Sequence, residues 1–179
     1  MLEFFAWVIG ATIVTAITVA LYASARKPDT FAVSRSAVIA APPETLFAII
    51  TDFRRWPEWS PWQHHDPNMK QTLSGSPSGV GAVSEWSGNS KVGAGRTEIT
   101  DVTSPAHVTM RLDMLRPMKA SNRVDYTLER SGGGTLVTWT ISGRQPLPAK
   151  IFATFVDCDD MVGRDFERGL ANLKALSER

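Results

Sequence analysis

The sequence predicts an α+β protein in which a curved antiparallel sheet wraps around a long C-terminal helix, preceded by one N-terminal transmembrane helix. Three observations lead to this prediction. An uncharged apolar run occupies Phe4–Ala23, short alternating runs separated by turn residues fill Met69–Gly143, and an amphipathic pattern runs over Ala149–Ser177. At 179 residues the chain has room for one domain and an appendage.

The N-terminal run predicts a membrane anchor over residues 1–25, with membrane contact through residues 4–23. About 20 apolar residues in a helix cross the roughly 30 Å hydrocarbon core. Ala23-Ser24-Ala25 could instead be read by a signal peptidase. No Lys or Arg precedes the run, however, and the run is longer than a signal-peptide core, so a retained anchor is favoured. Arg26, Lys27 and Arg35 follow it, which predicts a single-pass membrane protein with its soluble domain in the cytoplasm.

The remaining chain divides into a juxtamembrane linker at residues 26–32 and a ligand-binding domain at residues 33–179. A strand is predicted at Ser34–Ala40, and Pro42-Pro43-Glu44 opens a short helix. Alternating side chains predict a meander whose clearest hairpin loop is Ser131–Gly134. The predicted strands of this meander are Ala82–Trp86, Gly95–Val102, His107–Leu115, Ser121–Glu129 and Thr135–Ser142.

The last element is predicted as one helix from Ala149 to Ser177. Apolar side chains recur at spacings of three and four from Ile151 to Leu173, which makes one continuous stripe. Such a helix, after a curved antiparallel sheet, is expected to cross the concave face. Its acidic middle, Asp157, Asp159, Asp160 and Asp165, is interpreted as a solvent-facing, salt-bridged flank rather than as a catalytic carboxylate group.

Two motifs carry a family resemblance that covers about Thr30 to the C-terminus. The first is Pro42-Pro43-Glu44-Thr45-Leu46-Phe47, followed by Asp52-Phe53 and Trp56–Trp62, and the second is Met161–Lys174. With this order of elements, the chain resembles the START-like superfamily (SRPBCC), in its polyketide cyclase/dehydratase branch. The resemblance implies a helix-grip fold with a pocket between sheet and last helix. Members bind lipids, polyketides or other apolar molecules, and some catalyse cyclisation or dehydration. No catalytic motif of the family maps onto this sequence, so catalytic residues stay unknown.

Candidate ligand-binding residues follow from strand phase. Met side chains suit a pocket that accepts ligands of varied shape, and Asn122 and Tyr126 would orient a ligand. The alternative for Tyr126 is an ordinary core tyrosine bonded to a backbone carbonyl. Trp59 and Trp62 either form a pocket entrance or close the end of the core. The predicted set is Trp59, Trp62, Met110, Met114, Asn122, Tyr126, Trp139, Phe155 and Val162.

Composition and motifs narrow the function classes. A net charge of +1 argues against a nucleic-acid-binding surface. His64-His65-Asp66 lacks further ligands at a telling spacing, so a solvated loop is preferred and no metal is predicted. No cofactor is predicted, and the oligomeric state stays open.

Three functional hypotheses remain. The leading one is a membrane-anchored binder of a lipid or other apolar small molecule. An enzyme acting on a polyketide-like or aromatic substrate is the first alternative, and an interaction module with a filled core is the second. A polar dyad inside the cavity would favour the enzyme, whereas a core without a ligand-sized cavity would favour the interaction module.

Overall fold

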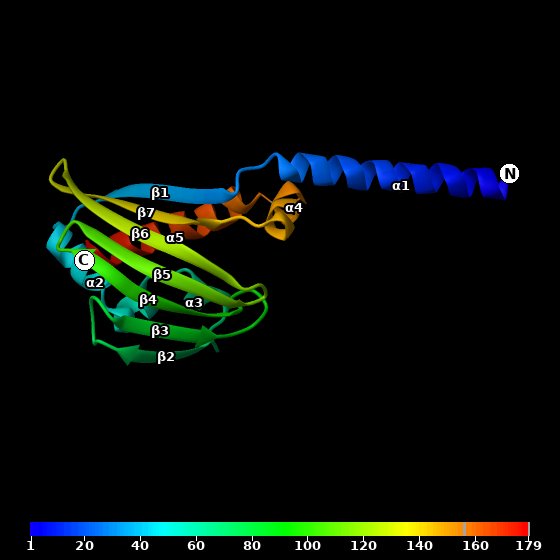
Figure 1. The fold of residues 1–179 in the computed structure, drawn as a ribbon. Coiled ribbons are helices and arrows are strands. Elements are labelled where there is room, and N and C mark those ends of the chain that lie inside the picture. Colours follow the sequence, from blue (N-terminus) through cyan, green and yellow to red (C-terminus); the bar gives the residue numbers. More distant parts are fainter. Residues whose placement is uncertain (156, 179) are drawn as a thin grey trace. The chain divides into compact units, whose positions relative to one another are not determined.

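The protein folds into two compact units, which are described separately. A computed structural model describes the backbone of residues 1–155 and 157–178 (Figure 1). Residues 1–31 and 144–158 make up the smaller unit, and residues 32–143 and 159–179 the larger one. Within the described backbone, side chains are described except at positions 2, 3, 6, 13, 16, 17, 20, 21, 25, 64, 152, 154, 155 and 158.

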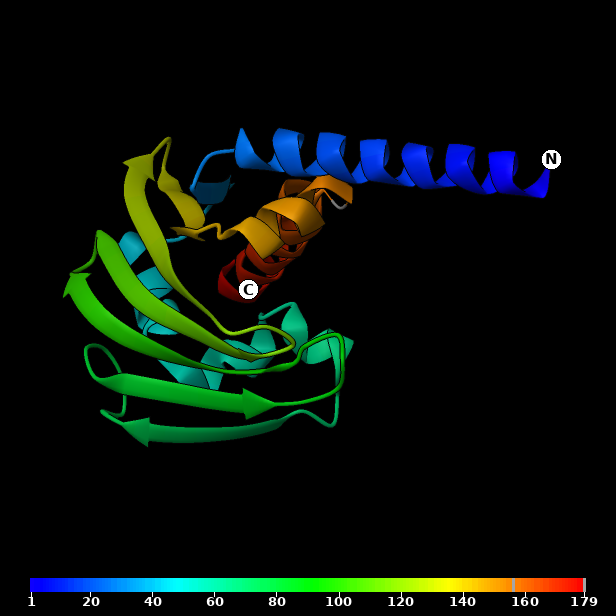
Figure 2. The same ribbon diagram turned by 45° about the vertical axis from the view of Figure 1, so that its right-hand side comes forward.

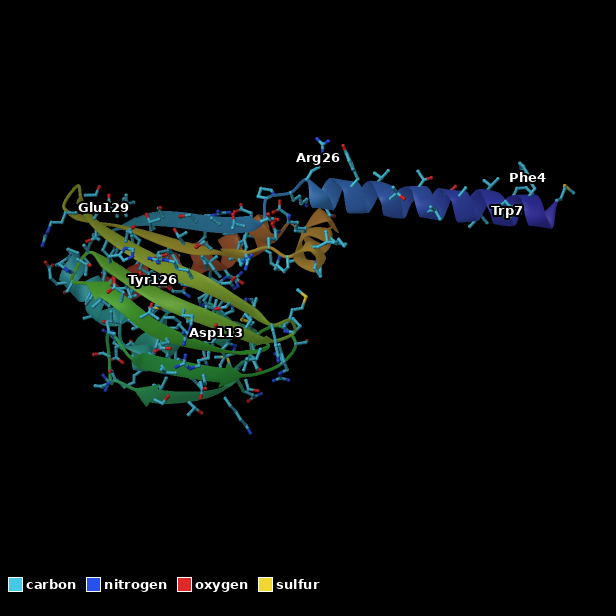
Figure 3. All side chains as sticks on the ribbon, viewed as in Figure 1. Phe4, Trp7, Arg26, Asp113, Tyr126 and Glu129 are labelled. Carbon is cyan, nitrogen blue, oxygen red and sulfur yellow. The ribbon has the colours of Figure 1, made fainter. Side chains whose placement is uncertain are left out.

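The smaller unit contains helices α1 (Leu2–Ala25) and α4 (Leu147–Phe155), which contact each other. Polar contacts join the segment that follows α1 to helix α4. The Lys150 ammonium lies 2.6 Å from a carboxylate oxygen of Asp29, and Lys27 donates to the carbonyl of Ala153 at 2.6 Å. Phe4 and Trp7 are exposed on α1 (Figure 3).

The prediction of a single-pass membrane protein with a cytoplasmic domain is wrong. Among the residues whose placement is described, no helix is long and apolar enough to cross a membrane. A membrane span needs about 20 consecutive, predominantly apolar residues.

The larger unit is built on a seven-stranded sheet with the order β1-β7-β6-β5-β4-β3-β2. Strands β2 to β7 follow one another as an antiparallel meander, with β1 beside β7. Gly132 and Gly133 take positive φ between β6 and β7, which makes the tight turn predicted there. The strands are β1 (Thr30–Ile39), β2 (Lys70–Gly75), β3 (Ala82–Ser87), β4 (Ala94–Thr103), β5 (His107–Arg116), β6 (Ala120–Ser131) and β7 (Gly134–Arg144).

Helices cover one face of this curved sheet (Figure 2). They are α2 (Pro43–Ile50), the 3₁₀ helix η1 (Phe53–Glu58), α3 (Trp62–His65) and α5 (Cys158–Ser177). Phe166, Leu170 and Leu173 of α5 are buried in the same apolar core as Met110 and Val137 of the sheet. The predicted α+β architecture, a curved antiparallel sheet around a C-terminal helix, is therefore confirmed.

Two elements differ from the prediction. The last helix is interrupted, because α4 ends at Phe155 and α5 begins at Cys158. Asp159 and Asp160 lie in the first turn of α5, where negative charge complements the helix dipole. Asp159 and Asp160 therefore mark a helix start, whereas Asp165 lies inside α5. Strand β2 was not predicted, because this edge strand is mostly exposed and shows no apolar alternation.

Candidate functional site

A cavity of about 220 Å³ lies inside the larger unit, between the sheet and the helices that cover it. Strands β2 to β7 provide one wall, and η1, α3 and α5 provide the other. Pro57 and Lys91 line the cavity and are exposed, so the cavity reaches the surface beside them. The apolar lining residues are Trp56, Pro57, Trp62, Met69, Trp86, Val92, Met110, Leu112, Met114, Val124, Trp139, Ile141, Val162 and Phe166, and the others are Ser60, Gln63, Gln71, Ser84, Lys91, Thr97 and Tyr126.

The structure brings six of the nine predicted residues to this lining. They are Trp62, Met110, Met114, Tyr126, Trp139 and Val162. Trp59 is buried beside them but does not line the cavity, and Asn122 is half-buried outside it. The side chain of Phe155 lies outside the described residues.

Five rings form an aromatic cluster: Trp59, Trp62, Tyr126, Trp139 and Phe166, and all of them except Trp59 line the cavity. Trp139 is at its centre, with its ring stacked on Phe166 at 4.1 Å between centroids and 8° between planes. The centroid of Trp139 also lies 5.0 Å from Tyr126, 5.5 Å from Trp62 and 5.7 Å from Trp59. Aromatic pairs at these separations stabilise beyond their buried area, so the cluster stabilises this part of the core.

Sequence reasoning missed the far wall of the cavity. Trp86 of β3 and Gln71 of β2 both line it. The indole of Trp86 donates to the Val92 carbonyl at 3.1 Å, and the amide of Gln71 donates to Ser84 Oγ at 2.9 Å. Trp86 could have been predicted as a lining residue from its position in a predicted strand, opposite Gly95. Gln71 could not, because β2 has no apolar alternation that would reveal the strand.

The electrostatic character of the cavity is close to neutral. Among the described lining residues, the only side chains that titrate are Lys91 and Tyr126. Lys91 is exposed, and Tyr126 has no exposed surface. Burial raises the pKa of the Tyr126 phenol well above its ordinary value of 10.0. The phenol therefore stays protonated across the physiological pH range.

The loop residues considered as metal ligands have structural partners. His65 Nε2 lies 3.1 Å from Asp165 Oδ1 of α5, and Asp66 accepts the backbone N–H of Asn89 at 2.7 Å and that of Asn68 at 3.0 Å. These contacts hold the segment around α3 in place at the cavity. The side chain of His64 lies outside the described residues.

A polar cluster, not foreseen in the sequence, lies outside the cavity lining on β5 and β6. His107 Nε2 is 3.0 Å from Asp125 Oδ1, and Thr109 Oγ1 donates to the same oxygen at 2.9 Å. Arg123 donates to both carboxylate oxygens. Burial by itself raises the pKa of the Asp125 carboxyl, but the hydrogen bonds from Arg123, Thr109 and His107 outweigh it and leave the pKa below its ordinary value of 3.8.

We expect this carboxylate to contribute acid-sensitive stability. Because its folded-state pKa is lowered, the contribution is present above the ordinary pKa of 3.8 and is lost as the pH falls through the folded-state value. Asp125→Asn should lower the urea midpoint at neutral pH and flatten its fall as the pH drops below about 5. Glu129→Gln, at an exposed position on the same strand, controls for the loss of one charge. An acid profile of Asp125→Asn with the wild-type slope would contradict the assignment.

Comparison with known proteins identifies the family. No curated protein matches the chain. Protein CV1439 from Chromobacterium violaceum is 14% identical with a TM-score of 0.60, covering 86% of this chain and 99% of its own. Ms6760 from Mycobacterium smegmatis is 21% identical with a TM-score of 0.58 (84% and 92% covered), and Aha1 from Colwellia psychrerythraea is 18% identical with a TM-score of 0.57 (83% and 96% covered). These likenesses show the shared fold. The model of the family described as polyketide cyclase / dehydrase and lipid transport matches residues 30–178, so the chain belongs to this family.

Proposed function

We propose that the protein binds a lipid or other apolar small molecule in the cavity between the sheet and α5. The observation that carries this proposal is the cavity itself, which encloses about 220 Å³ and is lined mostly by apolar and aromatic side chains. Apolar pockets with a few polar groups are the usual form of small-molecule sites. The family's description includes lipid transport, which agrees with this proposal.

The size of the cavity limits the ligand. An apolar cavity of roughly 150 Å³ accepts benzene, and this cavity, at about 220 Å³, is about half as large again. A molecule with two fused rings, or a short acyl chain, fits that space better than a whole two-chain lipid. A longer molecule would have to extend past Pro57 and Lys91, where the cavity reaches the surface.

Binding is favoured over the alternative of cyclisation or dehydration of a polyketide-like substrate. Acid–base catalysis needs a group whose pKa lies near the working pH. The titratable groups of the described lining are the exposed Lys91 and the phenol of Tyr126. Burial raises the pKa of this phenol, which moves it further from neutrality. The presence of a ligand-sized cavity also favours binding over an interaction module with a filled core.

We expect the 179-residue protein to bind 2-isopropylnaphthalene, a bicyclic hydrocarbon of suitable size. Leu112 of β5 lines the cavity, so Leu112→Trp should fill the space and weaken binding by at least about tenfold, since even one misplaced methylene costs roughly that much. Equilibrium dialysis at neutral pH measures the affinity. Native mass spectrometry of the purified protein additionally reports any small molecule that copurifies.

Leu115→Trp is the matched control for this experiment. Leu115 lies on the same strand but is 54% exposed, so its replacement should leave the affinity unchanged. Circular dichroism verifies that both variants remain folded. The proposal fails if the wild-type protein does not bind the hydrocarbon, or if Leu112→Trp binds it as tightly as Leu115→Trp does.

A further inference from the structure

Three buried polar atoms in the aromatic cluster lack a hydrogen-bond partner among the described residues: the indole nitrogens of Trp59 and Trp139 and the hydroxyl of Tyr126. Their residues are 1%, 2% and 0% exposed, respectively. Two other tryptophans that line the cavity do have partners, because Trp56 donates to the Ile50 carbonyl at 3.0 Å and Trp86 to the Val92 carbonyl at 3.1 Å. Among the described residues, the buried unpaired donors are therefore confined to the aromatic cluster.

Two of these three donors belong to residues that line the cavity. Tyr126 and Trp139 are cross-strand partners on β6 and β7, so their side chains leave the sheet side by side, with ring centroids 5.0 Å apart. A buried donor without an acceptor destabilises the protein. A ligand that brings an acceptor to this wall would remove that cost, whereas a pure hydrocarbon would leave it.

The chemistry of the donors defines the acceptor they need. An indole N–H only donates, and a phenol beside it has its hydrogen free to donate. The described lining contains no carboxylate, and its single cation, Lys91, is exposed. A carboxylate placed against two neutral donors would remain poorly compensated in an apolar site. A neutral carbonyl oxygen meets the requirement without introducing a charge.

We propose that the cavity selects an apolar molecule that carries a neutral carbonyl group, which accepts hydrogen bonds from the Tyr126 hydroxyl and the Trp139 indole. This inference rests on the proposed binding function and specifies the chemical class of its ligand. The apolar body of the molecule lies against the methionine and aromatic lining, and the carbonyl fixes its orientation at the β6–β7 wall. Because burial keeps the Tyr126 phenol protonated, this selectivity should not change across the neutral pH range.

Three probes of nearly equal shape test this selectivity: 2-acetylnaphthalene, 2-isopropylnaphthalene and 2-naphthoate. Tyr126→Phe removes only the hydroxyl, so it should weaken binding of the ketone by about 3- to 10-fold, the scale of one net hydrogen bond, and leave the hydrocarbon unaffected. The naphthoate should bind more weakly than the ketone. Tyr22→Phe, at the exposed second tyrosine, is the matched control and should bind all three probes as the wild type does.

An independent measurement reports on Trp139. In the ¹H–¹⁵N spectrum, the indole N–H resonance of Trp139, assigned from its loss in Trp139→Phe, should move downfield with the ketone but not with the hydrocarbon. Ligand-free Tyr126→Phe should melt no lower than the wild type, because its hydroxyl has no partner to lose among the described residues.

The outcomes separate this inference from the proposed function. Equal losses of ketone and hydrocarbon affinity in Tyr126→Phe, tighter binding of the naphthoate, or an unmoved Trp139 resonance would each overturn the carbonyl assignment while leaving apolar binding intact. A lower melting temperature of ligand-free Tyr126→Phe would show that the hydroxyl is already paired, and would overturn it as well. Absence of binding by all three probes would remove the proposed function and this inference together.

Discussion

Replacing Trp139 with alanine is expected to lower the free energy of unfolding by about 3–5 kcal/mol, the range found for large aromatic residues in cores. Trp139 is 2% exposed and contacts four other rings, including the stacked ring of Phe166 at 4.1 Å. Removing it opens a void in the middle of the aromatic cluster. The loss is a large fraction of the roughly 5–15 kcal/mol that stabilises a typical domain.

Urea unfolding followed by far-ultraviolet circular dichroism measures this loss without relying on tryptophan fluorescence. Trp7→Ala is the matched control, because Trp7 is 80% exposed and its replacement should change stability by no more than about 0.5 kcal/mol. A loss of under about 1 kcal/mol for Trp139→Ala, with an unchanged dependence on urea, would mean that the cluster does not hold the core together.

The architecture could be predicted because it depends on periodicity. The strands that form the wall of the cavity have one buried face, and the alternation along Val124, Tyr126 and Leu128 matches their observed burial. The two features that were missed have physical reasons. Strand β2 is an exposed edge whose side chains do not alternate, and the break before α5 depends on charge at a helix start rather than on apolar spacing. The apolar pattern continues through the break, so the sequence pattern could not reveal that the helix is interrupted there.

The candidate site could be predicted only where strand phase determines it. Met110, Tyr126 and Trp139 follow directly from alternation, and the structure places all three at the cavity. Trp59 and Trp62 look equivalent in sequence, yet only Trp62 lines the cavity, whereas Trp59 is buried outside the lining. Whether a buried donor has an acceptor depends on atoms distant in the chain. The unpaired donors of Tyr126 and Trp139, which define the proposed ligand, were therefore visible only in the structure.

Gly95→Ala is expected to destabilise the protein by about 2–3 kcal/mol, because it overpacks two rigid neighbours. A Cβ at this position would lie 2.5 and 2.6 Å from two ring atoms of Trp86, and 2.7 Å from the backbone carbonyl oxygen of Asp113. The Trp86 ring is held by its hydrogen bond to the Val92 carbonyl, and Asp113 belongs to the neighbouring strand of the ladder. Neither can move without breaking a contact, and a ring that did move would change the lining of the cavity.

The effect of Gly95→Ala therefore reaches both stability and binding. The urea midpoint should fall, and the affinity for 2-isopropylnaphthalene should fall with it because Trp86 lines the cavity.

Gly10→Ala is the matched control: a Cβ there meets nothing within 4 Å, and alanine is favoured over glycine in a helix, so stability should not decrease. A double-mutant cycle with Trp86→Ala separates the two neighbours. If Gly95→Ala costs nothing in the Trp86→Ala background, the ring alone causes the strain. If part of the cost remains in that background, the Asp113 carbonyl accounts for it, which is the result we expect because the backbone cannot yield. A wild-type midpoint for Gly95→Ala alone would show that β4 can shift away from both neighbours, and would contradict the close packing described for this wall.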